Sequence, residues 1–458
     1  HNGQLLSYFA NSTGIDTKRA VSHAEKAFPA WSHLTPVKRG QILSSIVSEM
    51  KKRSEELAEC VALETGKPPN DAIGEVLGAI LQGEYFAGEG MRLYGRGLTS
   101  GIPNKHTYTV RQPHGIAGLI VPANTPIANI AWKTFPALIC GNTVVLKASE
   151  DSPRIALLFA QIAKEAGLPA GVFNVVHGLG RPAGATLVED PRIALISFTG
   201  STKVGRWIAE IAGKRLARVS LELGGKNPFV VCDDADIEHA VKWAILSAFS
   251  NAGQRCSSGS RFLVFKNVYD SFRDRLVDKT QSLKLGVGED CDLGPVINSL
   301  QQENILAAIE KARSEGGNVL CGGSASSKPE LAGGYYVNPT IIEGLSPSAE
   351  INIKEIFGPV ITLHPVTDLA EAIESSNFSE YGLTAAIHTR SVDRAMVFAM
   401  SVRAGVANIN LGTYGSEPHM PFGGVGSSGN GTREPGIEAL DVYSELKNIS
   451  ILSRNNLI

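Results

Sequence analysis

One cysteine, Cys256, lies in a stretch of small and polar residues, Asn-Ala-Gly-Gln-Arg-Cys-Ser-Ser-Gly-Ser-Arg at 251–261. An apolar run of helical character, residues 243–249, precedes this stretch and can anchor it. Small neighbours such as Ser257 and Gly259 leave room for a substrate carbon to reach the sulfur. Two interpretations of Cys256 follow: it is a nucleophile, or it is a buried structural thiol, as most free cysteines are.

Three further motifs follow runs that resemble buried strands. Lys147 and Glu150 in KASE can grip the hydroxyls of a ribose or form an ordinary surface pair. Gly200 and Ser201 in FTGST open a helix, where free backbone N–H groups bind an anion or are simply capped. Glu222 lies in the apolar segment LELGG, so its carboxylate is either paired or a general base with a raised pKa. A fourth motif, GLGRPAG at 178–184, is only a weak dinucleotide fingerprint because its spacing is wrong.

The elements that must position these residues alternate between apolar strands and helices. The predicted strands of a first unit are 116–121, 143–147, 173–176, 194–199 and 218–223, with helices between them and four more helices in the first ninety residues. Asp16 is expected to cap the first of these helices. This alternation predicts a parallel sheet covered on both faces, whose ligand lies at the carboxyl ends of the strands. A second α/β unit has its strands at 227–232, 261–265, 359–366, 384–389 and 405–410.

Composition restricts the class of protein. The chain has 458 residues, of which 43% are hydrophobic and 19% charged, and its formal net charge is -2. These values fit a globular enzyme of two or three domains and argue against nucleic-acid or membrane partners. Six cysteines lie far apart without metal-ligand spacing, so we expect no metal site, free thiols and a cytoplasmic location. The chain begins without Met, so the completeness of the N-terminus stays open.

Several motifs in one order carry a resemblance. They are Asn124 in PANTP, KASE at 147–150, FTGST at 198–202, ELGGK at 222–226, GQRC at 253–256, EIFGP at 355–359 and PFGG at 421–424. Together they resemble the NAD(P)-dependent aldehyde dehydrogenase superfamily over nearly the whole chain. The resemblance implies an α/β fold with a Rossmann-type cofactor domain (1–100 and 114–224), an α/β catalytic domain (225–440) and a small β oligomerisation arm (101–113 and 441–458). Open strand edges in that arm predict a homodimer or homotetramer.

The resemblance also implies a mechanism. Cys256 attacks the aldehyde carbon, forming a thiohemiacetal and, after hydride loss, a thioester. The side-chain amide of Asn124 and the backbone N–H of Cys256 hold the oxyanion, and Glu222 activates the water that releases the acid. The residues implied for the cofactor, NAD with NADP as a second option, are Lys147, Glu150, Gly180, Phe198, Gly200, Ser201, Leu223, Gly224, Glu355 and Phe357.

The sequence departs from the family at two positions. Ala123 stands where the family often has Trp, so a phosphate contact is in doubt, and Ala148 stands where Pro is usual. The N-terminal strand segment of the family is short or absent.

Glu222 favours water rather than coenzyme A as acyl acceptor. Glu150 favours NAD, because a 2′-phosphate would lie beside a carboxylate.

The substrate is a small-molecule aldehyde whose identity the sequence leaves open. Our hypothesis is a distal anionic group that pairs with Arg255; the alternative is that Arg255 is structural. Other candidate substrate contacts are Ser257, Tyr414 and His419, then Glu417, with Arg111 and His114 weaker. Three alternative functions stay open: a coenzyme A-acylating semialdehyde dehydrogenase, a cysteine hydrolase, and a non-catalytic relative of the family.

Overall fold

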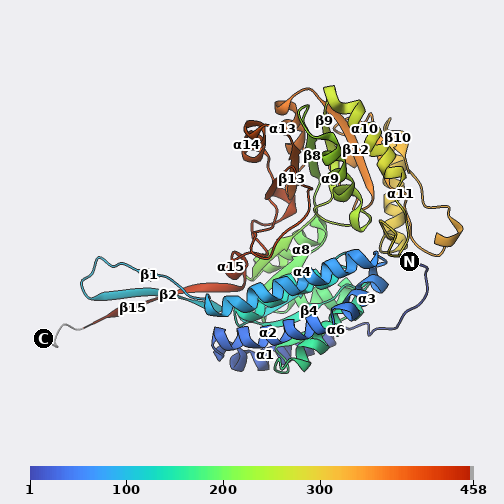
Figure 1. The fold of residues 1–458 in the computed structure, drawn as a ribbon. Coiled ribbons are helices and arrows are strands. Elements are labelled where there is room, and N and C mark those ends of the chain that lie inside the picture. Colours follow the sequence, from blue (N-terminus) through green and yellow to red (C-terminus); the bar gives the residue numbers. More distant parts are fainter. Residues whose placement is uncertain (454–458) are drawn as a thin grey trace.

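The computed structural model describes residues 1–453, so the predicted arm residues 454–458 lie outside the described part (Figure 1). Four helices begin the chain: α1 (Gly14–His33), α2 (Pro36–Lys52), α3 (Ser54–Thr65) and α4 (Pro69–Gly88). The prediction that Asp16 caps α1 was wrong, because the cap is Thr13. The Thr13 side chain accepts from the backbone N–H of Asp16, while the Asp16 carboxylate accepts from that of Thr13, which is a capping box. α3 ends at Gly66, whose φ of 72° is a left-handed conformation that glycine adopts without strain.

The first sheet has five parallel strands in the order β5-β4-β3-β6-β7. They are β3 (Ile116–Ile120), β4 (Thr143–Lys147), β5 (Phe173–Val176), β6 (Ile193–Thr199) and β7 (Arg218–Glu222), and they agree with the predicted strands. The helices that follow the strands, together with a π-helical turn, are α5 (Pro126–Ile139), α6 (Pro153–Glu165), η2 (Gly180–Gly184), α7 (Ala185–Glu189) and α8 (Thr202–Lys214). Val144 and Leu146 pack into one core cluster and Val145 into another, as the alternation of side chains along a strand requires.

The strand order places the switch point of this sheet between β3 and β6. β4 and β5 extend the sheet on one side of β3, whereas β6 and β7 lie on the other. Ligands of open α/β sheets bind in the crevice at such a point, outside the carboxyl ends of the strands. Asn124 follows β3 and Ser201 follows β6, so the two motifs meet at this crevice.

The second sheet has seven strands in the order β10-β11-β12-β9-β8-β13-β14, parallel except for the β10–β11 pair. The strands are β8 (Asn227–Val231), β9 (Gly259–Phe265), β10 (Asn318–Cys321), β11 (Thr340–Glu343), β12 (Val360–Val366), β13 (Thr384–His388) and β14 (Val406–Ile409). Its helices are α9 (Ile237–Phe249), α10 (Lys266–Gln281), α11 (Ser299–Ser314), α12 (Glu350–Ile353), α13 (Leu369–Asn377) and α14 (Val392–Ser401). The sequence prediction contained five of these strands and missed β10 and β11.

A three-stranded sheet, β1-β2-β15, projects from the body of the molecule as an arm (Figure 1). β15 (Ser444–Leu452) pairs along its whole length with β2 (Lys105–Pro113), and α15 (Ala439–Tyr443) leads into β15. β1 (Gly97–Leu98) pairs with β2, so the arm begins before the predicted residue 101. The single-turn helices outside the arm are η1 (Glu89–Met91), η3 (Ser250–Gly253), η4 (Pro329–Leu331) and η5 (Gly426–Ser428). Among residues 1–453, no helix is both long and apolar enough to cross a bilayer.

Candidate active site

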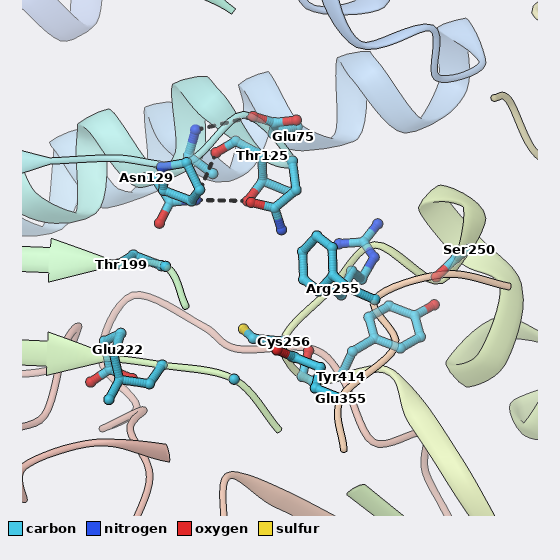
Figure 2. A pocket seen from close by; sticks show the side chains of 18 of the residues that line it. Glu75, Thr125, Asn129, Thr199, Glu222, Ser250, Arg255, Cys256, Glu355 and Tyr414 are labelled. Atoms are coloured by element: carbon cyan, nitrogen blue, oxygen red, sulfur yellow. Dashed lines mark hydrogen bonds between the residues drawn. The ribbon is translucent and has the colours of Figure 1, made fainter. Parts of the chain in front are cut away.

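A cavity of about 1100 Å³ contains the groups that the motifs predicted would meet (Figure 2). Thr199 and Glu222 reach it from the ends of β6 and β7, and Cys256 and Tyr414 reach it from the second α/β unit. The carboxyl ends of β6 and β7 and the segment before β9 therefore converge on one space. Its lining includes Asn124, Gly200, Ser201, Leu223, Gly224, Ser257, Arg255, Glu355 and Phe357.

Cys256 is held on a strained turn between α9 and β9. Asn251, Ala252 and Gly253 all have positive φ values, 53°, 53° and 69°. Such a conformation is costly for Asn and Ala, and it persists only where the surroundings enforce it. At Gly253 an added Cβ would lie 2.2 Å from the carbonyl oxygen of Gly358, so glycine is required there. The turn aims a free, half-buried thiol into the cavity.

The environment of Cys256 keeps the resting thiol protonated. Burial, together with the nearby carboxyl groups of Glu355 and Glu222, raises the pKa of Cys256 to about 12. The backbone N–H of Ser257 and the guanidinium of Arg255 oppose this shift. A nucleophilic Cys256 therefore needs a base that accepts its proton.

Glu222 fits that requirement. It is 5% exposed, and neither carboxylate oxygen has a hydrogen-bond partner within residues 1–453. Burial raises the pKa of Glu222 well above its usual value, and Glu434 raises it further. Glu434 forms a buried ion pair with Lys133, with Nζ and Oε2 2.9 Å apart. The sequence did not lead us to predict this pair, although a lysine inside the apolar helix α5 indicates a buried partner of opposite charge.

Asn124 lies beside the nucleophile loop. Its Nδ2 donates to the carbonyl oxygen of Gln254 at 2.9 Å, and its buried Oδ1 has no partner in the described chain. The amide nitrogen carries a second N–H, which can serve an oxyanion. Because Gln254 lies two residues before Cys256, this bond ties the amide to the segment that carries the thiol.

The residues predicted for the cofactor fall into two groups. Gly200, Ser201, Leu223, Gly224, Glu355 and Phe357 line the cavity, whereas Lys147, Glu150, Gly180 and Phe198 do not. Of the outer group, Lys147 at the end of β4 forms an ion pair of 2.7 Å with Glu150. The Phe198 ring occupies the place where a Cβ on Gly200 would lie.

This arrangement fits a dinucleotide. Ser201 caps α8, and its side chain accepts from the N–H of Val204, which leaves a helix N-terminus for a phosphate. Glu355 accepts from the N–H of Gly225 at 3.0 Å, and a Cβ on Gly224 would lie 2.3 Å from the other Glu355 oxygen. Burial raises the pKa of Glu355 to about 7. The Glu355 carboxylate can accept hydrogen bonds from ribose hydroxyls, and Gly224 and Gly225 beside it have no side chain in the way. The N-terminus of α8 suits a pyrophosphate.

The substrate candidates are only partly brought together. Arg255, Ser257 and Tyr414 line the cavity, and the Arg255 guanidinium lies over the Tyr414 ring, 5.2 Å from its centroid (Figure 2). His419 was predicted here, but it is exposed outside the lining, with its Nδ1 3.9 Å from Glu417, which does line the cavity.

The two weaker candidates belong to the arm. Arg111 donates to Ser444 and lies 2.7 Å from Asp441, so it fastens β2 to the β15 side. His114 has Nδ1 4.0 Å from Glu445 of β15. Neither lines the cavity. The sequence reading missed further lining residues on α4 and α5, among them Asp71, Glu75 and Trp132.

Comparisons with known proteins agree with this geometry. The model of the aldehyde dehydrogenase family matches residues 1–449. An alpha-ketoglutaric semialdehyde dehydrogenase of Bacillus subtilis is 38% identical over 98% of this chain and 92% of its own length. A succinate-semialdehyde dehydrogenase [NADP(+)] of Escherichia coli is 37% identical over 98% of this chain and 92% of its own. The solved structure of PnpE with nicotinamide adenine dinucleotide has a TM-score of 0.96 and 38% identity, covering 99% of this chain and 93% of that one.

The chain belongs to the aldehyde dehydrogenase family. It is an NAD(P)-dependent aldehyde dehydrogenase, which confirms the predicted fold and reaction class. The cysteine-hydrolase and non-catalytic alternatives are set aside. Consistent with this, no histidine of the described chain lines the cavity, so Cys256 has no partner of the protease kind.

Proposed function

We propose that Cys256, Glu222 and Asn124 carry out the oxidation of an aldehyde to a carboxylic acid. The Cys256 Sγ bonds to the carbonyl carbon as its proton passes to Glu222, and the carbonyl electrons move to an oxygen held by the Asn124 amide and the Cys256 backbone N–H. The bound nicotinamide supplies the acceptor for the hydride of the substrate C–H. Glu222 then releases the Cys256 proton to solvent and takes a proton from the water that attacks the thioester carbon. As the bond between carbon and sulfur breaks, Glu222 returns that proton to the Cys256 Sγ, which frees the acid and restores the thiol.

The cofactor is proposed to lie across the switch point of the first sheet. Ser201 and the start of α8 would receive the pyrophosphate, Glu355 the nicotinamide ribose, and Lys147 and Glu150 the adenosine ribose. Gly180 would border the adenine at an open surface, since an added Cβ there meets no atom within 4 Å. The Glu150 carboxylate supports NAD over NADP, because it would repel a 2′-phosphate.

One observation supports a substrate with a distal anionic group. Arg255 Nε is buried without a hydrogen-bond partner in residues 1–453, and the guanidinium faces the cavity that holds Cys256. Burying an unpaired charged donor is costly, so a ligand carboxylate or phosphate is the natural partner. The relatives named for semialdehydes of dicarboxylic acids are consistent with this proposal.

A panel of aldehydes of equal length tests the substrate proposal. A hydrogen bond to a charged group contributes about 1.5–3 kcal/mol, which is roughly 10- to 150-fold in kcat/KM. We expect Arg255→Leu to lose that factor on ω-carboxyl aldehydes and to change little on neutral ones. Arg255→Lys, which keeps the charge without the forked donors, should fall between. Equal losses on both kinds of aldehyde would refute the proposal.

Water is the proposed acyl acceptor because Glu222 is present and lies buried in the wall of the cavity that holds Cys256. Turnover that requires coenzyme A would refute this and favour the acylating alternative.

The arm supports a proposed homodimer or homotetramer in the cytoplasm. β15 is the outer strand of its sheet, and Leu446, Ile451 and Leu452 on it are 47%, 51% and 65% exposed. A second copy can cover this edge. All six cysteines are free thiols, as is usual in a reducing compartment. Sedimentation as a 48.6 kDa monomer would overturn the assembly proposal.

A further inference from the structure

A buried ion pair in the wall of the cavity takes no part in the proposed chemistry. Lys67 follows α3 and Glu75 belongs to α4; their Nζ and Oε2 atoms are 2.5 Å apart, and the side chains are 2% and 5% exposed. Burial lowers the pKa of Lys67, and the Glu75 carboxylate opposes that shift. Desolvating two charges is costly, so such a pair contributes little to stability beyond what apolar residues of equal size would. Its remaining hydrogen bonds indicate a different use.

Those hydrogen bonds reach both ends of one short turn. Lys67 Nζ donates to the backbone carbonyl of Asn124 at 2.9 Å. Glu75 Oε1 accepts from the backbone N–H of Ala128, in the first turn of α5, at 3.2 Å (Figure 2). A carboxylate at this place satisfies a free N–H of the helix and complements its dipole. The pair therefore holds the segment 124–128 at its beginning and at its end.

The same segment is held from the nucleophile side. Asn251 Nδ2 donates to the Asn124 carbonyl at 3.1 Å, and the Asn124 amide donates to Gln254 at 2.9 Å. Lys67 and Asn251 thus share one carbonyl oxygen, and the Asn124 side chain is fixed between the two units of the molecule. Without Lys67, one of the two donors to that oxygen is lost and Glu75 stays buried without its counter-charge.

We propose that the Lys67–Glu75 pair positions the oxyanion site by fixing the backbone of Asn124. Lys67 and Glu75 act through Asn124, so they are positioning residues. The inference rests on the role of Asn124 in the proposed function. It predicts that removing the pair slows the steps that build negative charge on the substrate oxygen, while cofactor binding and thiol access stay the same.

The test is a double-mutant cycle of Lys67→Met with Asn124→Ala, measured as kcat/KM for a neutral aldehyde. Removing one donor to an oxyanion costs about 10²–10³-fold, and displacing it should cost part of that, about 10- to 100-fold. We expect that loss for Lys67→Met alone and less than about 3-fold once Asn124 is already Ala. The Kd for NAD and the rate at which iodoacetamide alkylates Cys256 should change less than about 2-fold.

A control and a second variant complete the design. Lys51→Met removes an exposed ion pair to Glu84, on the same helix α4, and should leave kcat/KM unchanged. If Lys67→Met fails to fold, Glu75→Gln, which is of equal size, gives the same cycle. A loss of the same factor with and without Asn124→Ala would overturn the inference, because the pair would then act on the fold generally. If Asn124→Ala itself has no effect, the proposed role of Asn124 fails instead.

Discussion

Replacing Glu222 by Gln removes the proposed base from both halves of the reaction. Glu222 is buried and its oxygens have no partner in residues 1–453, so a carboxamide of the same size fills the same space. Gln cannot take a proton, and losing a positioned general base costs about 10²–10⁴-fold, or roughly 3–5 kcal/mol of barrier. Attack by Cys256 and hydrolysis of the thioester should therefore both slow. Wild-type kcat should also rise with pH, because burial and Glu434 raise the pKa of Glu222 and only its ionised form is a base.

The assay is rapid mixing with NAD and an excess of aldehyde, monitored at the nicotinamide absorbance. The Gln variant should reduce nicotinamide about 10²–10⁴-fold more slowly than the wild type, from the first turnover onward. Glu210→Gln, which changes an exposed carboxylate of α8 that pairs with Lys214 outside the cavity, should behave as wild type. Normal turnover in the Glu222 variant, or the same rising pH profile without Glu222, would refute its role as the base.

Three further predictions follow from charge. Glu150→Gln should improve kcat/KM with NADP about 5-fold, since an exposed charge contact contributes up to about 1 kcal/mol, and steady-state kinetics with both cofactors checks this. Glu355→Gln should lower the pKa of Cys256 and speed its alkylation by iodoacetamide at pH 8 while weakening NAD binding; slower alkylation would contradict this. Burial lowers the pKa of His388 to about 4, so the unfolded state alone binds the proton between pH 6.5 and 4. The free energy of unfolding should therefore fall by up to about 3 kcal/mol as the pH drops across that window. The Tm of His388→Phe should fall less over the same pH range than the Tm of the wild type, and equal falls in Tm would contradict the assignment.

The sequence predicted those parts of the fold whose signals are local. The strands 143–147 and 173–176 are continuous apolar runs between turn residues, and they are β4 and β5 without change. β10 and β11 were missed because they break the alternation of strand and helix: only loop and the short turn η4 lie between them, and the two strands pair antiparallel. The cap of α1 was misplaced because Asp16 is itself part of the capping box with Thr13.

The candidate site shows the same difference between residues that have a local sequence signal and residues that only the fold connects. Cys256 and Glu222 were singled out because each lies in a motif of contiguous residues, and both line the cavity. The pair of Lys133 with Glu434 spans 301 positions, and no local pattern connects its members. His419 was placed at the cavity from its loop alone, whereas only the backbone path decides which residues of a loop face inward.

The high pKa values of Cys256 and Glu222 do not argue against their roles as nucleophile and base. Burial is the largest cause of both shifts, and it disfavours a negative charge on either group. When the proton passes from the thiol to the carboxylate, the cavity holds one negative charge before and one after. The penalty of burial therefore largely cancels, and the transfer depends on the difference between the two pKa values. The same burial keeps the thiol protonated until Glu222 ionises, so the pH profile of the enzyme should report the pair as one unit.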